Sequence, residues 1–151
     1  MESFRMDLLE VALGYTVSFC QDNYVKSNYG VIRGLHYQTP PSAQSKLLSV
    51  IEGTILDVAV DIRKGSPNFG KHIAVELSSK DQKQLFITRG FAHGYACLSE
   101  TARVTYKVDN YYNKFSEASI AFDDPQLNID WRLPLDEIIL SKKVYDVLKF
   151  S

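Results

Sequence analysis

Residues 55–62 read ILDVAVDI, and this stretch decides the fold class. Its even-numbered positions are all apolar, whereas Asp57 and Asp61 fall on odd positions, as the period of two in a half-buried β-strand requires. The segments 72–77 and 103–109 repeat this alternation. Turn-forming clusters separate such segments at intervals of roughly 8 to 12 residues. The sequence therefore predicts an all-β fold, an antiparallel sandwich or barrel.

Helical periodicity is confined to the two ends of the chain. Residues 2–13 carry an apolar stripe that stops at Gly14, and residues 144–150 are expected to form a last turn or two. No linker, internal repeat or low-complexity segment interrupts the sequence. At 151 residues, the chain is expected to form one domain spanning residues 1–151.

The composition excludes several classes of function. Lys and Arg number 17 against 18 Asp and Glu, a net charge of −1, so the bulk positive field of nonspecific nucleic-acid binders is missing. The two cysteines form neither a disulfide scaffold nor a CxxC pair. Charges in the first ten residues interrupt any secretory signal, and no apolar run approaches the roughly 18 residues of a membrane span. We therefore expect a cytoplasmic protein with no nucleic-acid or membrane partner.

Candidate acid–base residues gather in residues 30–38, GVIRGLHYQ. On a regular strand Arg33 and His36 differ in parity and project to opposite faces, unless Gly34 introduces a bulge or kink. Considered alone, a histidine such as His36 is more often a surface residue or a satisfied core residue than a catalyst.

Three further polar side chains occupy apolar surroundings. Lys46 shares parity with Leu48, which would point it inward, but a strand-end lysine in solvent is the more common outcome for such a residue. Tyr106 alternates with apolar neighbours, so its phenol is expected to point inward, where a core tyrosine bonded to backbone is the ordinary outcome. His93 lies among small and aromatic residues and fits a packed strand with one polar member.

Together, these segments resemble the dTDP-4-dehydrorhamnose 3,5-epimerase family, whose fold is a cupin-type jelly roll. The resemblance implies a cupin-type β-barrel or sandwich with short helices at the termini, and an isomerase that needs no cofactor. The matching stretches run in family order from about residue 2 to residue 140: 30–38, 43–47, 57–63 with 65–67, 90–94, 98–100, 106–107 with 111–112, and 128–131.

The resemblance assigns roles to the candidate residues. A 4-keto group acidifies the protons on C3 and C5 of a hexose, so epimerisation needs a base, an acid on the opposite face and an electrophile for the enolate oxygen. His36 matches the family's base, Tyr106 its acid, Lys46 the cation beside the enolate, and His93 a further polar wall of the pocket.

The same resemblance implies a dTDP-linked nucleotide-sugar substrate and a homodimer formed by strand exchange. Gln21, Asn23 and Arg33 match contacts to the nucleotide and its diphosphate, for which a guanidinium group is suited. Further contacts at the nucleotide or sugar end match Tyr112, Glu117 and Lys142. The sequence does not distinguish which nucleobase and which sugar the substrate carries. It also leaves open whether the final product is lipopolysaccharide, another glycan or an antibiotic sugar.

Two features depart from the family pattern. Family members usually begin a couple of dozen residues earlier, so their N-terminal segment is expected to be absent here. The family also pairs its histidine base with an aspartate from a Leu-Ser-x-Lys-Asp motif, and Val144 stands at that position. Asp146 or Asp57 is the substitute available to orient His36.

Rival functions follow from these departures and from the fold. A single-carbon epimerase acting on a related nucleotide-keto-sugar is one alternative, and a catalytically weakened cupin that binds a nucleotide sugar is another. A metal-dependent cupin would need an HxH pair with a downstream carboxylate. Residues 36–38 read HYQ, and Lys46 stands near the place of that carboxylate, so the sequence predicts no metal.

Overall fold

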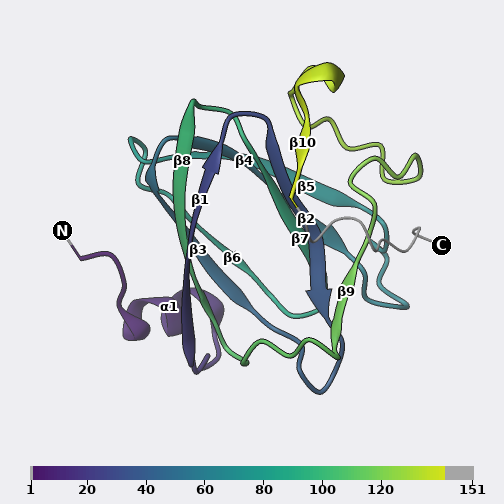
Figure 1. Ribbon diagram of the computed structural model, residues 1–151. Helices are drawn as coiled ribbons and strands as arrows, with labels where there is room; N and C mark the ends of the chain where they lie inside the picture. Colours follow the sequence, from purple (N-terminus) through teal and green to yellow (C-terminus); the bar gives the residue numbers. More distant parts are fainter. Residues whose placement is uncertain (1, 142–151) are drawn as a thin grey trace.

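Two β-sheets packed face to face form the protein (Figure 1). The computed structural model describes residues 2–141. Along this part of the chain the elements are α1 (Met6–Leu13), β1 (Gln21–Asn28), β2 (Val31–Gln38), β3 (Lys46–Glu52), β4 (Thr54–Asp61), β5 (His72–Ser78), β6 (Gln84–Ile87), β7 (Phe91–Cys97), β8 (Thr101–Val108), β9 (Glu117–Ser119), the 3₁₀ turn η1 (Leu135–Glu137) and β10 (Ile139–Leu140).

The strand order explains why residues distant in sequence meet. One sheet has four strands in the order β1-β8-β3-β6, and the other runs β10-β2-β7-β4-β5, with β9 paired to the free part of β2. All these pairs are antiparallel except β10 with β2. The prediction of an antiparallel β-sandwich is confirmed.

Two apolar clusters hold the sandwich together. The first lies between the sheets and joins Leu48 and Val104 of the four-stranded sheet to Ile55 and Tyr95 of the other. The second covers the outer face of the six-stranded sheet, where Trp131 and its neighbours in residues 120–140 pack on β2, β4 and β7. Only one end of the space between the sheets is therefore filled with apolar side chains.

The expectation that residues 55–62 form a half-buried strand is wrong, because both faces of β4 are covered. Leu56, Val58 and Val60 pack under the C-terminal segment, and each is fully buried. The opposite face points between the sheets and carries Asp57 and Asp61, which are also buried. Asp61 accepts hydrogen bonds from neighbouring Arg and Ser side chains, and the Arg63 guanidinium holds the pKa of that carboxyl far below its ordinary value.

A β-bulge in β2 settles the parity conflict between Arg33 and His36. Arg33 pairs with Tyr95 and His36 pairs with His93, so two residues of β2 stand opposite the single Gly94 of β7. The bulge turns both Arg33 and His36 toward the space between the sheets. The sequence predicted this shared orientation only on the condition that Gly34 interrupts the strand alternation.

The bulge depends on two glycines in close contact. Gly34 has a φ of +118°, and a Cβ added there would lie 2.5 Å from the Cα of Gly94. A Cβ on Gly94 would lie 2.6 Å from the carbonyl oxygen of Arg33. Side chains at these positions would force the two strands apart, so the glycines permit the approach that aims His36 inward.

The predicted N-terminal helix is present but shorter than expected. It spans Met6–Leu13 and ends at Gly14, whose left-handed conformation lets its N–H donate to the Glu10 carbonyl at 2.8 Å. The helix predicted for residues 144–150 lies outside the described residues. Within the described part of the chain, no helix is long and apolar enough to span a bilayer.

Candidate active site

A cavity of about 280 Å³ opens between the sheets, beyond the end that apolar side chains fill. Both sheets contribute to it, with strands β1, β3 and β8 on one side and β2 and β9 on the other. The lining residues are Gln21, Asn23, His36, Tyr37, Gln38, Gln44, Lys46, Tyr106, Tyr112 and Glu117. The structure thus brings together the residues predicted as base, acid and cation.

Ser119 fixes the position of His36. The two residues are direct cross-strand partners in the β2–β9 pair, and His36 Nδ1 lies 2.8 Å from Ser119 Oγ. The serine is 7% exposed. A buried hydroxyl at this distance forms a hydrogen bond that restrains the imidazole ring.

Lys46 and Tyr106 face His36 from the four-stranded sheet. The inward orientation predicted for both is confirmed, since their strand neighbours Leu48, Val104 and Val108 are fully buried. The Lys46 ammonium lies 5.8 Å from the centroid of the Tyr106 ring, within cation–π range. Burial raises the pKa of Tyr106 above its ordinary value of 10, so its phenol keeps its proton at neutral pH.

His93 stands behind Lys46 and connects it to a buried carboxylate. Its Nε2 lies 2.8 Å and 3.0 Å from the two oxygens of Asp57, whose side chain is inaccessible to solvent. Its Nδ1 lies 3.5 Å from Lys46 Nζ. Because Nε2–H donates to Asp57, Nδ1 is left as an acceptor for the ammonium. Asp57 was a candidate partner for His36, but the structure places its carboxylate against His93 instead.

Polar side chains connect across the rim of the cavity. The Tyr112 hydroxyl donates to Glu117 at 2.6 Å, and this hydrogen bond raises the pKa of Tyr112. Gln21 Nε2 donates to Asn23 at 2.9 Å, while its side-chain oxygen accepts from the Tyr112 N–H at 3.2 Å. The predicted binding residues on β1 and β9 therefore form a connected rim.

Among the predicted site residues that the structure describes, Arg33 and His93 do not line the cavity. Arg33 points inward, and its guanidinium donates to Ser27 Oγ at 2.9 Å and to the Lys26 carbonyl at 3.3 Å. Lys142 lies outside the described residues, as do Val144 and Asp146, the positions that bear on the family's aspartate.

Sequence reasoning missed Gln38, which organises the loop beside the cavity. It is 8% exposed, and its amide donates to the carbonyls of Ser42 and Tyr111 and accepts from the Asn113 N–H at 2.8 Å. The signal was available, because Gln38 follows His36 by two residues and therefore shares its face. Ser119 was also missed, since a short strand shows no clear periodicity.

Within residues 2–141, no group of three or more His, Cys, Asp or Glu side chains is arranged to hold a metal ion. His36 and His93 are cross-strand partners, but each ring is engaged by a different side chain, Ser119 and Asp57 respectively. The prediction that the protein binds no metal remains a prediction.

An imidazole and a phenol on opposing sheets, with an ammonium beside the phenol, can move protons to and from a substrate held between them. This set of groups inside a cupin-like sandwich is typical of a proton-transfer enzyme.

Comparisons with known proteins identify the family. The profile of the dTDP-4-dehydrorhamnose 3,5-epimerase family matches residues 1–151. The chain is 48% identical to a dTDP-4-dehydrorhamnose 3,5-epimerase of Shigella flexneri, over 99% of this chain and 82% of that protein. The chain therefore belongs to the dTDP-4-dehydrorhamnose 3,5-epimerase family.

Solved structures agree with this assignment. The enzyme of the same name from Elizabethkingia anophelis NUHP1 superposes with a TM-score of 0.94 at 48% identity, covering 99% of this chain and 81% of that one. A 3,5-epimerase from Legionella pneumophila, solved in complex with dTDP-4-keto-L-rhamnose, gives a TM-score of 0.92 at 48% identity, covering 98% and 77%. The cupin-type fold predicted from the sequence is confirmed.

Proposed function

We propose that this chain is a dTDP-4-dehydrorhamnose 3,5-epimerase, an isomerase that inverts C3 and C5 of a dTDP-4-keto-6-deoxyhexose. The observation that carries the proposal is the pairing of His36 on one sheet with Tyr106 on the other around a single cavity. Relatives 42–48% identical over most of the chain bear this name, which supports the same activity here.

The reaction begins when the His36 imidazole removes the proton on a carbon next to the 4-keto group. The electrons move into an enolate, whose negative oxygen is stabilised by the Lys46 ammonium. Tyr106 then donates its phenolic proton to the opposite face of that carbon, which inverts the configuration. The His36 imidazolium then releases its proton to solvent and the Tyr106 phenolate takes one up, after which the same steps invert the second carbon.

Asp57 and His93 keep Lys46 suited to this role. A partly buried ammonium such as that of Lys46 loses hydration, and an acceptor or an opposite charge offsets this cost. The His93 Nδ1 acceptor lies 3.5 Å from Lys46 Nζ, and Asp57 is the buried carboxylate behind it. The pair offsets the cost of an inward-pointing lysine and restrains it beside Tyr106.

The nucleotide extends beyond the cavity in this proposal. Pockets that enclose a whole drug-sized ligand have volumes of about 300–1,000 Å³, whereas this cavity holds about 280 Å³. We therefore assign the cavity to the hexose and the connected rim of Gln21, Asn23, Tyr112 and Glu117 to the nucleotide end. Arg33 and Lys142 stay assigned to that end because their residue types suit phosphate oxygens.

Proton exchange in heavy water tests the proposed activity. Incubation with dTDP-4-keto-6-deoxyglucose in D₂O is expected to place deuterium at both C3 and C5, as followed by proton NMR. The product is expected to be dTDP-4-dehydrorhamnose. Deuterium at one carbon only would replace the proposal with a single-carbon epimerase, and exchange at neither carbon would leave a binding protein without turnover.

Tyr106→Phe is expected to separate proton removal from inversion. Without the phenol, His36 still abstracts a proton and returns one from its own face. Deuterium should then enter with retention of configuration, while formation of the rhamno product falls by about 10²-fold or more. NMR of the isotopically labelled sugar distinguishes the two outcomes, and inversion at the wild-type rate would exclude Tyr106 as the acid.

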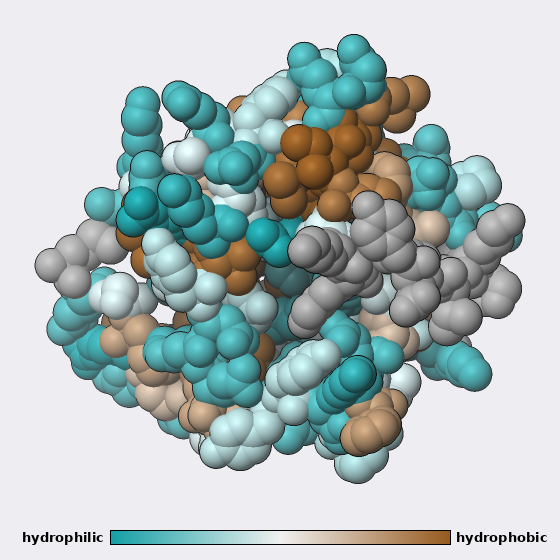
Figure 2. All heavy atoms as spheres, in the orientation of Figure 1, coloured by the Kyte–Doolittle hydropathy of each residue, from teal (hydrophilic) through white to brown (hydrophobic). Residues whose placement is uncertain are grey.

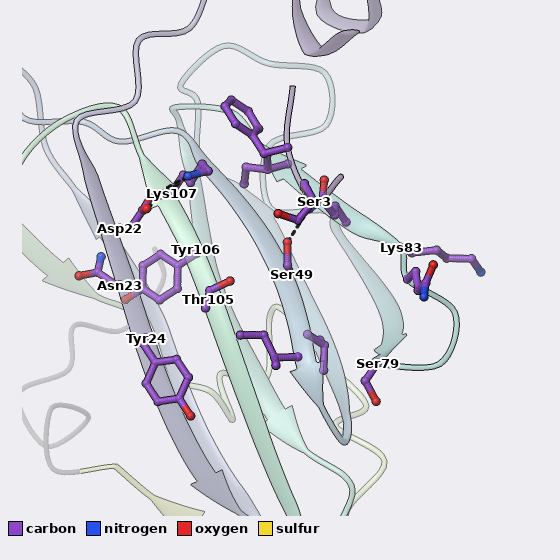
Figure 3. Close-up of a pocket in the computed structure, with 16 residues that line it drawn as sticks. Ser3, Asp22, Asn23, Tyr24, Ser49, Ser79, Lys83, Thr105, Tyr106 and Lys107 are labelled. Atoms are coloured by element: carbon purple, nitrogen blue, oxygen red, sulfur yellow. Dashed lines mark hydrogen bonds and ion pairs between the residues drawn. The ribbon is translucent and has the colours of Figure 1, made fainter. Parts of the chain in front are cut away.

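We also propose that the chain forms a homodimer, through the outer face of the four-stranded sheet. A hollow of about 540 Å³ lies on this face (Figure 3). The exposed apolar side chains of Tyr24 and Ile51 border it, beside the ion pair of Asp22 with Lys107. Sedimentation should show a dimer, and Ile51→Glu should shift it toward monomer. A dimer unaffected by that charge would place the contact elsewhere.

A further inference from the structure

The side-chain amide of Gln38 lies at the end of β2, where it contacts two separate loops. Its Nε2 group donates one hydrogen to the Ser42 carbonyl at 2.7 Å and the other to the Tyr111 carbonyl at 3.2 Å. Its oxygen accepts a hydrogen bond from the Asn113 N–H at 2.8 Å. Both amide hydrogens therefore bind protein backbone, and the residue is only 8% exposed.

Only one orientation of this amide satisfies its surroundings. If the amide were reversed, its oxygen would face the carbonyl oxygens of Ser42 and Tyr111. Its NH₂ group would then face the N–H of Asn113. Three backbone groups therefore determine which end of the Gln38 amide donates and which accepts.

These contacts hold the backbone of Tyr112 from one side, and Gln21 holds it from the other. The Tyr111 carbonyl and the Asn113 N–H, which flank Tyr112, both bind Gln38. The Tyr112 N–H instead donates to the side-chain oxygen of Gln21 at 3.2 Å, and Gln21 belongs to β1 in the opposite sheet. Because the carbonyl oxygen and the N–H of a trans peptide point in opposite directions, glutamines from both sheets restrain the 111–112 peptide.

The segment that carries Tyr112 depends on such side-chain contacts for its shape. Residues 109–116 form neither helix nor strand. Asn110 Nδ2 donates to the carbonyls of Pro41 and Ala43, at 3.1 Å in each case, and so joins the segment to the loop that follows Gln38. The segment in turn presents Tyr112 to the cavity.

We propose that Gln38 is a positioning residue for nucleotide binding, which acts by holding Tyr112 at the rim of the cavity. This rests on the proposed function, in which Tyr112 belongs to the nucleotide end. A rim residue that is already ordered spares the ligand the entropic cost of ordering it. Because the Gln38 amide binds backbone groups rather than the proton-transfer side chains, its loss should affect substrate binding more than turnover.

Gln38→Met tests the proposal, because methionine is similar in size but forms none of these hydrogen bonds. The Kd for dTDP and the KM for the keto-sugar are expected to rise by about 5- to 30-fold. The kcat value should fall by less than about threefold. Titration calorimetry with dTDP and initial rates give these values. Wild-type Kd and KM in this variant would overturn the proposal, as would a fall in kcat as large as the rise in KM.

A double-mutant cycle with Tyr112→Ala shows whether Gln38 acts through Tyr112. In the Tyr112→Ala background, Gln38→Met should weaken dTDP binding by less than about twofold further, because the positioned side chain is gone. Additive effects of the two substitutions would overturn the proposal. Gln38→Asn keeps an amide that is one methylene too short to reach both loops, and it serves in the same cycle if the methionine variant does not fold.

Ser99→Ala is the control for lost hydrogen bonds between side chain and backbone. The Ser99 hydroxyl accepts from the Thr54 N–H at 2.9 Å and donates to the Thr101 carbonyl at 2.7 Å, but it does not line the cavity. This variant should bind dTDP and turn over as the wild type does. A Kd raised as much as in Gln38→Met would assign the effect to general destabilisation and overturn the proposal.

The two proposals fail in different ways. If the wild-type protein binds dTDP and the cycle shows coupling, but neither C3 nor C5 exchanges its proton, the proposed function fails while the role of Gln38 stands. If both carbons exchange but the substitutions are additive, the function stands and the role of Gln38 is wrong. A wild-type protein that does not bind dTDP would overturn both.

Discussion

His36→Asn is expected to lower deuterium uptake at both C3 and C5 by about 10²- to 10⁴-fold, the range that general acid–base catalysis contributes. Asparagine is similar in size and retains a polar group near Ser119, but its amide cannot accept a proton near neutral pH. Because one imidazole serves both carbons in the proposed mechanism, the two rates should fall together. Initial exchange rates measured by NMR in D₂O give both values.

The control must separate lost chemistry from lost binding. His72 lies at the start of β5 and does not line the cavity, so the His72→Asn variant should show exchange at the wild-type rate. The thermal shift produced by dTDP should be the same in wild type and His36→Asn. If exchange were lost at one carbon only, a second base would have to serve the other carbon, and the single-base mechanism would be wrong.

Gly34→Ala is expected to destabilise the protein by about 2–5 kcal/mol, from backbone strain and steric overlap together. The φ of +118° is unfavourable for an L-residue, and the new Cβ would lie 2.5 Å from Gly94 Cα and 2.6 Å from the His93 carbonyl oxygen. At about 2–4 °C per kcal/mol for a domain of this size, the melting temperature should fall by about 5–15 °C. Calorimetry or thermal unfolding followed by circular dichroism measures the change.

Gly65→Ala separates the two causes. Gly65 has a φ of +82°, but a Cβ there would meet no atom within 4 Å. This variant should lose only the roughly 1–2 kcal/mol of a left-handed L-residue. Folded Gly34→Ala should also lose epimerase activity, because the bulge aims His36. If both variants lost the same stability, steric overlap with Gly94 would add nothing to the backbone strain of the positive φ in Gly34→Ala.

Alternation in the sequence was sufficient to predict the sandwich, but not to say which strand faces are covered. The pattern of residues 55–62 correctly identified β4. Its apparent polar face is nevertheless buried, because Asp57 and Asp61 have partners that no local pattern reveals. Its other face is covered by Trp131 and its neighbours, from a segment with little regular structure. Burial by distant, irregular chain cannot be inferred from periodicity.

The candidate site was predictable where side chains follow strand parity. Lys46 and Tyr106 point inward as their alternation indicates. For His36 the sequence could only state a condition, since the effect of Gly34 depends on the glycine opposite it in β7. The partners of both histidines depend on strand pairing, and no spacing along the chain connects Asp57 to His93 or Ser119 to His36.

Because the catalytic groups are divided between the two sheets, the apolar side chains packed between the sheets set the distance between those groups. His36 belongs to the six-stranded sheet and Tyr106 to the four-stranded one, so the gap across which a sugar ring must fit is the thickness of the sandwich. Leu48, Val104 and Tyr95 set that thickness although none of them lines the cavity. Because a packed core relaxes only partly around a shortened side chain, a smaller residue at one of these positions would loosen the separation of the two walls rather than close it.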